Sequence, residues 1–243
     1  MGTYGLIGYP LDHSFSKIYF EEKFSRENIS GCDYRLWPIQ SIDEFLPLIK
    51  SIRDLKGLNV TIPYKELVIR FLDELDVVAE GIKAVNCITF VEGKLKGYNT
   101  DVIGLETSLS NLLSFMPEQA FILGSGGSSK AAIYVLKKLK IPYTIVSTRK
   151  EPGYIGYADI TREMKSSNLF INTTPLGTFP DIDTFPDIPY FALTPNDFLF
   201  DLVYNPAETI FIIRGKAKGA KTKNGLEMLQ IQAEKSWEIW NEI

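Results

Sequence analysis

Ala120-Phe121-Ile122-Leu123-Gly124-Ser125-Gly126-Gly127 is the segment from which the architecture of this chain can be worked out. Its four apolar residues predict a buried strand, and the glycines allow a tight turn into a helix, which apolar spacing predicts through Ala131–Leu139. The apolar run Tyr143–Val146 then predicts a second strand. A strand, a helix and a strand in this order form a βαβ unit, which is typical of a parallel sheet covered by helices.

The glycine turn of this unit has the context of a phosphate-binding loop. Between a strand and a helix, glycines let backbone amides approach a pyrophosphate, and the positive end of the helix stabilises its charge. We therefore expect Gly124, Gly126, Gly127 and Ser128 to contact a dinucleotide. Ser129 stands where the last glycine of the full fingerprint would fall, so an ordinary tight βα connection is the alternative.

The residues after the second strand, Ser147-Thr148-Arg149-Lys150, indicate which dinucleotide binds. A carboxylate in this place accepts hydrogen bonds from a free adenosine ribose, and none is present. The guanidinium of Arg149 suits a 2′-phosphate, so we expect Thr148 and Arg149 to bind NADP in preference to NAD. In the alternative reading, Arg149 and Lys150 form a solvated turn, which Glu151 follows closely.

The alternation of strands and helices extends in both directions along the chain. Outside the βαβ unit, apolar runs predict strands at Tyr4–Gly8, Tyr34–Ile39, Leu58–Ile62, Ala84–Val91, Lys94–Tyr98, Leu169–Asn172 and Phe198–Val203. Helical spacing predicts helices at Lys17–Asn28, Phe45–Ile52, Asp101–Leu113, Thr209–Lys218 and Leu226–Trp240. Between Glu151 and Ile160, a proline and glycines interrupt the periodicity, which predicts a shortened helix or a loop.

The length of 243 residues, 45% of them hydrophobic, allows one large domain or two ordinary domains with buried cores. We predict an α/β protein with two domains. The first is an α/β domain with a mostly parallel sheet, and the second is a Rossmann-like nucleotide-binding domain. A domain boundary is expected near the helix that follows Asn99-Thr100-Asp101.

Composition argues against several kinds of partner and site. The 26 basic and 30 acidic residues give a net charge of −4, so no broad basic surface is available for nucleic acid. No apolar run approaches the length that spans a bilayer, and no export signal is indicated. Because His13 is the only histidine and Cys32 and Cys87 are isolated, we expect no metal site, no disulfide and a reduced, cytoplasmic setting.

Two charged residues stand out in polar clusters near predicted strand ends. Lys65 ends the cluster Asn59-Val60-Thr61-Ile62-Pro63-Tyr64-Lys65, and Asp101 ends Asn99-Thr100-Asp101. Together with the glycine turn that follows them, Lys65 and Asp101 suggest a nucleotide-dependent enzyme acting on a polar substrate. A solvated surface pair is the alternative.

Neutral polar residues accompany them. Ser14, Ser16, Asn59, Thr61 and Asn86 supply donors and acceptors near strand ends, where open α/β sheets form binding clefts. Such groups suit a polyhydroxylated ligand, although each of them alone is more typical of a helix cap or a turn.

In this combination and order, the motifs resemble the shikimate dehydrogenase family over nearly the whole chain. The resemblance rests on His13-Ser14-Phe15-Ser16, Asn59–Lys65, Ala84-Val85-Asn86, Asn99-Thr100-Asp101, Gly124-Ser125-Gly126-Gly127, Asn172-Thr173-Thr174-Pro175-Leu176-Gly177 and Gly225-Leu226-Glu227-Met228-Leu229-Gln230-Ile231-Gln232-Ala233. It implies reversible NADP-dependent interconversion of 3-dehydroshikimate and shikimate, a step of aromatic amino acid biosynthesis. It also marks Lys65 and Asp101 as the catalytic pair.

The resemblance further implies the roles of individual residues. It places Ser14, Ser16 and Tyr204 around the substrate carboxylate and Thr61, Asn86, Asp101 and Gln232 around the ring hydroxyls. It places Thr173, Leu202 and Gly225 at the cofactor. The C-terminal helix is expected to return to the first domain, so the substrate domain would comprise residues 1–101 and 222–243, and the NADP-binding domain residues 102–221.

The chain departs from the family pattern at several positions. Cys87 stands in place of a more usual threonine, Thr178 and Leu202 replace frequent methionines near the nicotinamide, and the segment after Arg149 is short. Alternatives stay open: a quinate/shikimate dehydrogenase with relaxed cofactor use, or a non-catalytic NADP-binding sensor. The oligomeric state, monomer or homodimer, stays open too.

Overall fold

The computed structural model describes residues 2–11 and 14–242. The chain divides into two compact units: unit 1 contains Met1–Ile103 and Gln230–Ile243, and unit 2 contains Gly104–Leu229. Two helices cross from one unit to the other along the sequence. Helix α4 (Thr100–Leu112) begins in unit 1 and ends in unit 2, and α8 (Leu226–Asn241) begins in unit 2 and ends in unit 1. Unit 1 is therefore built from two separate parts of the sequence.

Unit 1 contains a six-stranded sheet with the order β2-β1-β3-β5-β6-β4. Its strands are β1 (Gly2–Gly8), β2 (Cys32–Pro38), β3 (Leu55–Val60), β4 (Glu74–Leu75), β5 (Cys87–Val91) and β6 (Lys94–Tyr98). β1 is parallel to β2 and β3, and β4 is parallel to β6, whereas β5 is antiparallel to both of its neighbours. The strands predicted at Ala84–Val91 and Lys94–Tyr98 correspond to β5 and β6, which form an antiparallel hairpin.

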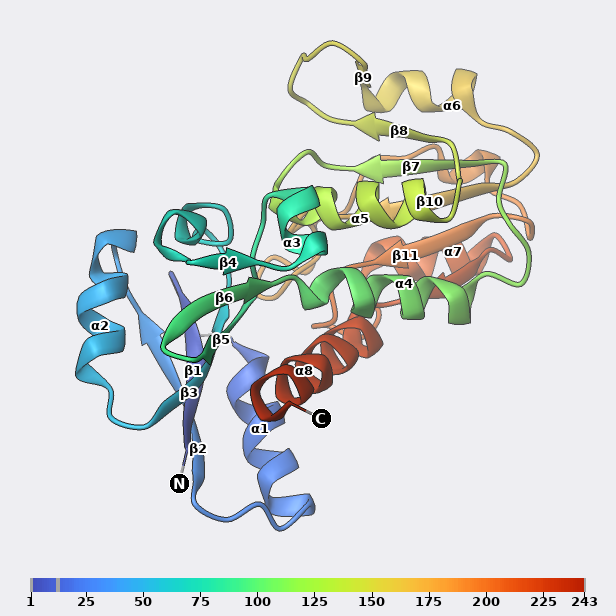
Figure 1. Ribbon diagram of the computed structural model, residues 1–243. Helices are drawn as coiled ribbons and strands as arrows, with labels where there is room; N and C mark the ends of the chain where they lie inside the picture. The colour runs from blue at the N-terminus through green and yellow to red at the C-terminus, as the bar shows by residue number, and fades with distance from the viewer. Residues whose placement is uncertain (1, 12–13, 243) are drawn as a thin grey trace. The chain divides into compact units, whose positions relative to one another are not determined.

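Helices cover both faces of this sheet (Figure 1). On one face, α1 (Phe15–Arg26) and α8 bury aromatic side chains, including Phe20 and Trp240. The other face is covered by η1 (Ile42–Glu44), α2 (Phe45–Ser51), η2 (Leu67–Phe71) and α3 (Val77–Ile82). The two apolar clusters explain why every residue of β1 is buried.

Helix α8 is part of the core of unit 1 through Trp240. The Trp240 indole N–H donates a hydrogen bond to the Ile88 carbonyl at 3.0 Å. A Cβ on Gly57 would lie 2.3 Å from the indole ring, so β3 leaves room for this side chain only because residue 57 is glycine.

Unit 2 contains a six-stranded sheet with the order β12-β11-β10-β7-β8-β9, in which every pair is parallel. Its strands are β7 (Gln119–Leu123), β8 (Tyr143–Val146), β9 (Tyr154–Ile155), β10 (Asn168–Asn172), β11 (Phe198–Asp201) and β12 (Lys221–Lys223). From β7 the sheet extends through β10, β11 and β12 on one side and through β8 and β9 on the other, as in doubly wound nucleotide-binding folds. The predicted α/β fold with a Rossmann-like half is confirmed.

The helices of unit 2 confirm the expected βαβ unit and the expected interruption. Helix α5 (Gly127–Lys138) connects β7 to β8, and α7 (Ile210–Ala217) packs on β11 and β12. Between β8 and β10, a full crossover helix is replaced by β9, η3 (Tyr157–Asp159) and the four-residue α6 (Ile160–Glu163). A short η4 (Tyr190–Ala192) precedes β11. Within the described residues, no helix is both long enough and apolar enough to cross a membrane.

Candidate active site

One edge of the unit 1 sheet collects polar residues from distant parts of the sequence. β3 ends at this edge, β5 begins there because it is antiparallel to β3, and β6 ends there because it is antiparallel to β5. In this register, Asn59 pairs with Cys87, and Cys87 pairs with Tyr98. The residues that follow β3, precede β5 and follow β6 are therefore neighbours in space.

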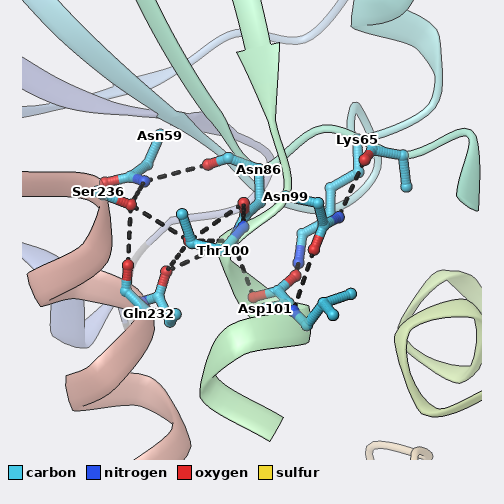
Figure 2. Close-up of polar contacts among 10 residues, drawn as sticks. Asn59, Lys65, Asn86, Asn99, Thr100, Asp101, Gln232 and Ser236 are labelled. Atoms are coloured by element: carbon cyan, nitrogen blue, oxygen red, sulfur yellow. Dashed lines mark hydrogen bonds and ion pairs between the residues drawn. The ribbon is translucent and has the colours of Figure 1, made fainter. Parts of the chain in front are cut away.

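Lys65 and Asp101 meet at this edge (Figure 2). Lys65 lies in the loop after β3, and its Nζ donates to Asp101 Oδ2 at 2.6 Å. Asp101 stands in the first turn of α4. The side chains are 20% and 18% exposed, respectively, so the pair is partly shielded from water but reachable by a ligand. The Lys65 carbonyl accepts a hydrogen bond from the Val85 N–H at 2.8 Å, which anchors the loop.

Asn86 holds the second oxygen of the carboxylate. Asn86 Nδ2 donates to Asp101 Oδ1 at 2.9 Å, while Asn86 Oδ1 accepts the Thr100 backbone N–H at 2.7 Å. Both Asp101 oxygens therefore have partners of fixed position, one on Lys65 and one on Asn86 (Figure 2). The hydrogen bond from Asn86 orients the Asp101 carboxylate, and the carboxylate in turn orients the Lys65 amine.

Asn59 is 6% exposed and reaches the Lys65–Asp101 pair only through Asn86. Its Oδ1 accepts a hydrogen bond from the Tyr34 hydroxyl at 2.9 Å, and its Nδ2 donates to the Asn86 carbonyl at 3.1 Å and to Ser236 Oγ at 3.0 Å. Burial raises the pKa of the Tyr34 hydroxyl well above its ordinary range, with an opposing hydrogen bond from Ser16. The Tyr34 hydroxyl therefore keeps its proton at neutral pH and donates it in the hydrogen bond to Asn59.

Helix α8 contributes Gln232 and Ser236 to the same cluster (Figure 2). Thr100 Oγ1 lies 3.4 Å from Gln232 Oε1 and 3.3 Å from Ser236 Oγ. Ser236 Oγ also donates to the Gln232 carbonyl at 2.9 Å. The last helix therefore contacts Asn86 and Thr100 of unit 1.

Three further predicted substrate contacts lie in unit 1 close to strand ends. Ser14 directly precedes α1 and makes no side-chain cap to that helix, Ser16 lies in its first turn, and Thr61 follows β3. Tyr204 follows β11 in unit 2. His13, which belongs to one of the family motifs, lies outside the described residues.

The glycine turn of unit 2 has the shape expected of a phosphate cradle. Gly124 has φ +106°, and an added Cβ would lie 2.8 Å from Thr174 Cγ2 and 2.9 Å from Thr173 Oγ1. At Gly126 and Gly127 an added Cβ would meet no atom within 4 Å, so the backbone borders open space where α5 begins. The residues present therefore fit a pyrophosphate bound by backbone amides, with Ser128 in the first turn.

The loop after β8 is tied to this turn. Ser147 Oγ accepts the Arg149 backbone N–H at 3.0 Å and lies 3.2 Å from Ser125 Oγ. The side chains of Thr148 and Arg149 are exposed. They border a cavity of about 680 Å³ that is lined by residues 147–151, 154–157 and 159. The shortened segment after Arg149 therefore forms one wall of a pocket next to the loop.

The other predicted cofactor contacts follow neighbouring strands of the same sheet. Thr173 follows β10 and donates from Oγ1 to the Leu123 carbonyl at 2.8 Å. Leu202 follows β11, and Gly225 directly precedes α8. A Cβ on Gly225 would lie 2.2 Å from the Leu202 carbonyl oxygen, which requires glycine at this position. All of these residues lie at the edge where parallel strands end, where such sheets bind ligands.

A buried carboxylate supports this edge. Asp201, the last residue of β11, is 0% exposed and accepts hydrogen bonds from Asn172 Nδ2 (2.9 Å), the Val203 N–H (3.0 Å) and Thr209 Oγ1 (2.6 Å). Burial raises the pKa of Asp201 to about 6, although these hydrogen bonds oppose the shift. The carboxylate joins β10, β11 and the start of α7.

Three members of the unit 1 cluster were not expected from the sequence: Tyr34, Thr100 as a side-chain contact, and Ser236. The signal for Ser236 was its spacing, because residues four apart lie on one face of a helix and Gln232 was already a candidate. Nothing in the sequence indicates that Tyr34 would reach Asn59. In residues 2–11 and 14–242, no group of three or more His, Cys, Asp or Glu side chains is placed to hold a metal ion.

A sequence model described as "Shikimate dehydrogenase substrate binding domain" matches residues 6–88. A shikimate dehydrogenase (NADP(+)) from Clostridium beijerinckii is 39% identical over 100% of this chain and 93% of its own length. Its counterpart from Methanococcus maripaludis is 35% identical over 98% of this chain and 91% of its own length. The structure of shikimate 5-dehydrogenase from Thermus thermophilus in complex with NADP(H) and shikimate is 27% identical, with a TM-score of 0.85, and covers 100% of this chain and 94% of its own.

Proposed function

The chain belongs to the shikimate dehydrogenase family, and on that premise we propose that it catalyses the reversible NADP-dependent reduction of 3-dehydroshikimate to shikimate in aromatic amino acid biosynthesis. The observation that carries the proposal is the contact of 2.6 Å between Lys65 and Asp101 at the end of the sheet, in the unit whose sequence matches the family's substrate-binding domain. Quinate would require additional room for a hydroxyl near Ser14 and Ser16.

Reduction of a ketone requires a hydride at carbon and a proton at oxygen. NADPH, when bound, supplies the hydride. Lys65 is the proposed proton donor to the carbonyl oxygen in reduction and the proton acceptor in oxidation. Asp101 holds the amine through Oδ2, while Asn86 fixes the carboxylate through Oδ1. We treat Lys65 and Asp101 as one acid–base unit because the amine and the carboxylate are in direct contact.

We assign substrate binding to unit 1 and NADP binding to unit 2. Ser14, Ser16 and Tyr204 are proposed contacts of the substrate carboxylate, and Thr61, Asn86, Asp101 and Gln232 are proposed contacts of the ring hydroxyls. Neutral hydroxyl and amide groups suit a polyhydroxylated ring because they both donate and accept. Asn59, which was expected among these contacts, has its side chain engaged with Tyr34, Asn86 and Ser236.

For the cofactor, we propose that the backbone of Gly124, Gly126 and Gly127, with Ser128, binds the pyrophosphate. Thr148 and Arg149 would bind the 2′-phosphate, for which the pocket beside β8 leaves room. Thr173, Leu202 and Gly225 complete the proposed cofactor contacts along the same edge of the sheet.

Steady-state oxidation of shikimate and of quinate, each with NADP and with NAD, tests the proposal. We expect NADPH formation from shikimate to have the highest kcat/KM of the four combinations. A higher kcat/KM with quinate would favour the quinate/shikimate alternative, and binding of NADP without turnover of either substrate would favour a non-catalytic sensor. A cytoplasmic location stays a prediction that rests on the two isolated cysteines.

A further inference from the structure

Ser236 is a buried hydroxyl on α8 that contacts β3 and α4 as well as its own helix (Figure 2). It is 0% exposed and lies one turn after Gln232 on α8. Its Oγ lies 3.0 Å from Asn59 Nδ2 at the end of β3, 3.3 Å from Thr100 Oγ1 at the start of α4 and 2.9 Å from the Gln232 carbonyl. No role in catalysis or binding follows from these contacts directly, because Ser236 does not face solvent.

The hydrogen-bonding capacity of Ser236 accounts for all three contacts. A serine hydroxyl has one proton and two lone pairs. The proton goes to the Gln232 carbonyl, so Ser236 accepts from Asn59 and from Thr100. Loss of the hydroxyl would leave an Asn59 N–H buried without this acceptor, which is costly in a protein interior.

The same contacts connect α8 to β3 and α4 beside Gln232. Gln232 is held at its backbone by Ser236, and its Oε1 lies 3.4 Å from Thr100 Oγ1 and 3.5 Å from Asn86 Nδ2. Asn86 in turn contacts Asp101. A change in the orientation of α8 at Ser236 would therefore move the Gln232 amide relative to the catalytic pair.

We propose that Ser236 is a positioning residue for substrate recognition, which holds the Gln232 side chain in the orientation that binds a substrate hydroxyl. This inference rests on the proposed function, because it requires Gln232 to contact shikimate. Ser236 itself does not contact the substrate. Its effect is expected on substrate binding, since binding geometry is sensitive to displacements of about 1 Å.

A double-mutant cycle of Ser236→Ala and Gln232→Ala tests the proposal. We expect Ser236→Ala to raise the KM for shikimate about tenfold, as expected for a buried hydrogen bond, and to leave kcat within about twofold. The dissociation constant of NADPH, measured by fluorescence, should stay unchanged. In the Gln232→Ala background, Ser236→Ala should have almost no further effect on KM, because the group that it positions is gone.

The matched control is Ser110→Ala in unit 2. Ser110 also donates from Oγ to the carbonyl four residues earlier, at 2.9 Å from the Glu106 oxygen, but it is exposed. This variant should leave the KM for shikimate unchanged. Thermal unfolding of every variant shows whether the fold is kept, so a loss of stability can be separated from a change in KM.

The outcomes distinguish a failure of the positioning role of Ser236 from a failure of the proposed substrate site. If Ser236→Ala raises KM by the same factor with and without Gln232, Ser236 does not act through Gln232 and the positioning role is overturned. A Ser236→Ala variant with a lower melting temperature and an unchanged KM overturns it as well. If Gln232→Ala alone leaves KM unchanged, Gln232 is not a substrate contact, and the proposed substrate site fails together with the inference.

Discussion

The Lys65 amine and the Asp101 carboxylate are brought together by chain segments that end at the same sheet edge, and each has a second anchor. The Lys65 loop is held through its carbonyl by the Val85 N–H, and Asp101 is held through Oδ1 by Asn86. Surface ion pairs contribute little to stability, so a partly shielded pair with fixed partners is better explained by chemistry than by stability. Replacing either residue should therefore affect catalysis more than folding.

Lys65→Ala should lower kcat by at least about 100-fold, which is the ordinary contribution of general acid–base catalysis. The affinity for NADPH should be nearly unchanged, because Lys65 lies in unit 1 and the proposed cofactor contacts lie in unit 2. Stopped-flow or steady-state rates and a fluorescence titration measure the two quantities. Lys50→Ala, which removes an exposed lysine from α2, is the control. Near-normal turnover of Lys65→Ala would remove this residue from its assigned role.

Arg149→Ala should raise the KM for NADPH much more than the KM for NADH. A guanidinium binds phosphate oxygens with two parallel hydrogen bonds, and NADH has no 2′-phosphate to lose. Steady-state rates with both cofactors at saturating substrate measure the two constants. An equal change in both would contradict recognition of the 2′-phosphate and favour the reading of Arg149 as a solvated turn residue.

Asp201 should make the free energy of unfolding depend on pH. Its pKa is raised to about 6 in the folded state, above the ordinary 3.8, so the native state binds the proton more tightly than the unfolded state. The contribution of Asp201 to stability is then fully present below about pH 4 and is lost as the pH rises through about 6.

The Asp201→Asn variant cannot titrate at this position and isolates the effect. We expect the free energy of unfolding of the wild type minus that of the variant to fall by about 2 to 3 kcal/mol between about pH 4 and 7. Urea unfolding at a series of pH values measures it. A difference that is constant or that rises with pH would show that the three hydrogen bonds to Asp201 outweigh its burial.

At the scale of elements, the turn between β7 and α5 contains glycines that serve two different purposes. Gly124 adopts a positive φ and is packed against Thr173 and Thr174, whereas Gly126 has φ −85° and open space around it. The first glycine is required by the fold, and the second leaves room for a ligand. The same turn therefore carries both a structural and a binding role.

Gly124→Ala and Gly126→Ala should fail in different ways. Gly124→Ala should lower the free energy of unfolding by about 1 to 3 kcal/mol, because the backbone conformation and the two threonines both oppose a Cβ. Gly126→Ala should keep the stability of the wild type and weaken NADPH binding, since its methyl group would occupy the space proposed for the pyrophosphate. Chemical unfolding and a fluorescence titration distinguish the two effects. Equal stability losses in both variants would contradict this separation.

Long elements with a clear apolar period could be predicted from the sequence, and short elements without one could not. The predicted helices at Lys17–Asn28 and Leu226–Trp240 agree with α1 and α8 to within two residues at each end. The two-residue β4 and the three-residue β12 are too short to show a period. They are strands because they pair with β6 and β11, respectively. Helix α3 was also missed, although Asp76 caps it by accepting the Ala79 N–H at 2.8 Å.

The site shows the same division. Lys65 and Asp101 could be predicted because each follows a recognisable strand and belongs to a motif. The contacts of Ser236 and Tyr34 with Asn59 could not, because they span 177 and 25 positions of sequence. The spacing of Ser236 from Gln232 indicates only that the two residues share one face of a helix. Such long-range pairings are set by the packing of α8 and β2 and leave no local pattern.

At the scale of the whole molecule, the two units divide the residues of the proposed reaction. The proposed catalytic pair lies in unit 1, together with most of the proposed substrate contacts, whereas the glycine turn and Arg149 lie in unit 2. The division predicts that each ligand alone should stabilise mainly the unit to which it binds.

Hydrogen–deuterium exchange of the whole chain tests this division. NADP alone should slow exchange at residues 124–128 and 147–150, and shikimate alone should slow exchange at residues 61–65 and 99–101, because bound ligands suppress local opening. Protection by NADP alone that is confined to residues 61–65 and 99–101 would contradict the assignment of the cofactor to unit 2.

The split composition of unit 1 has a consequence for the order of events during translation. Residues 230–242 leave the ribosome only after all of unit 2 has been made, so unit 2 has its complete sequence first and can fold first. Until then the nascent first 103 residues lack Trp240, which packs on Phe20 and hydrogen-bonds Ile88, and they lack Gln232 and Ser236. A polypeptide stalled before residue 230 would therefore carry its nucleotide fold but no finished catalytic centre.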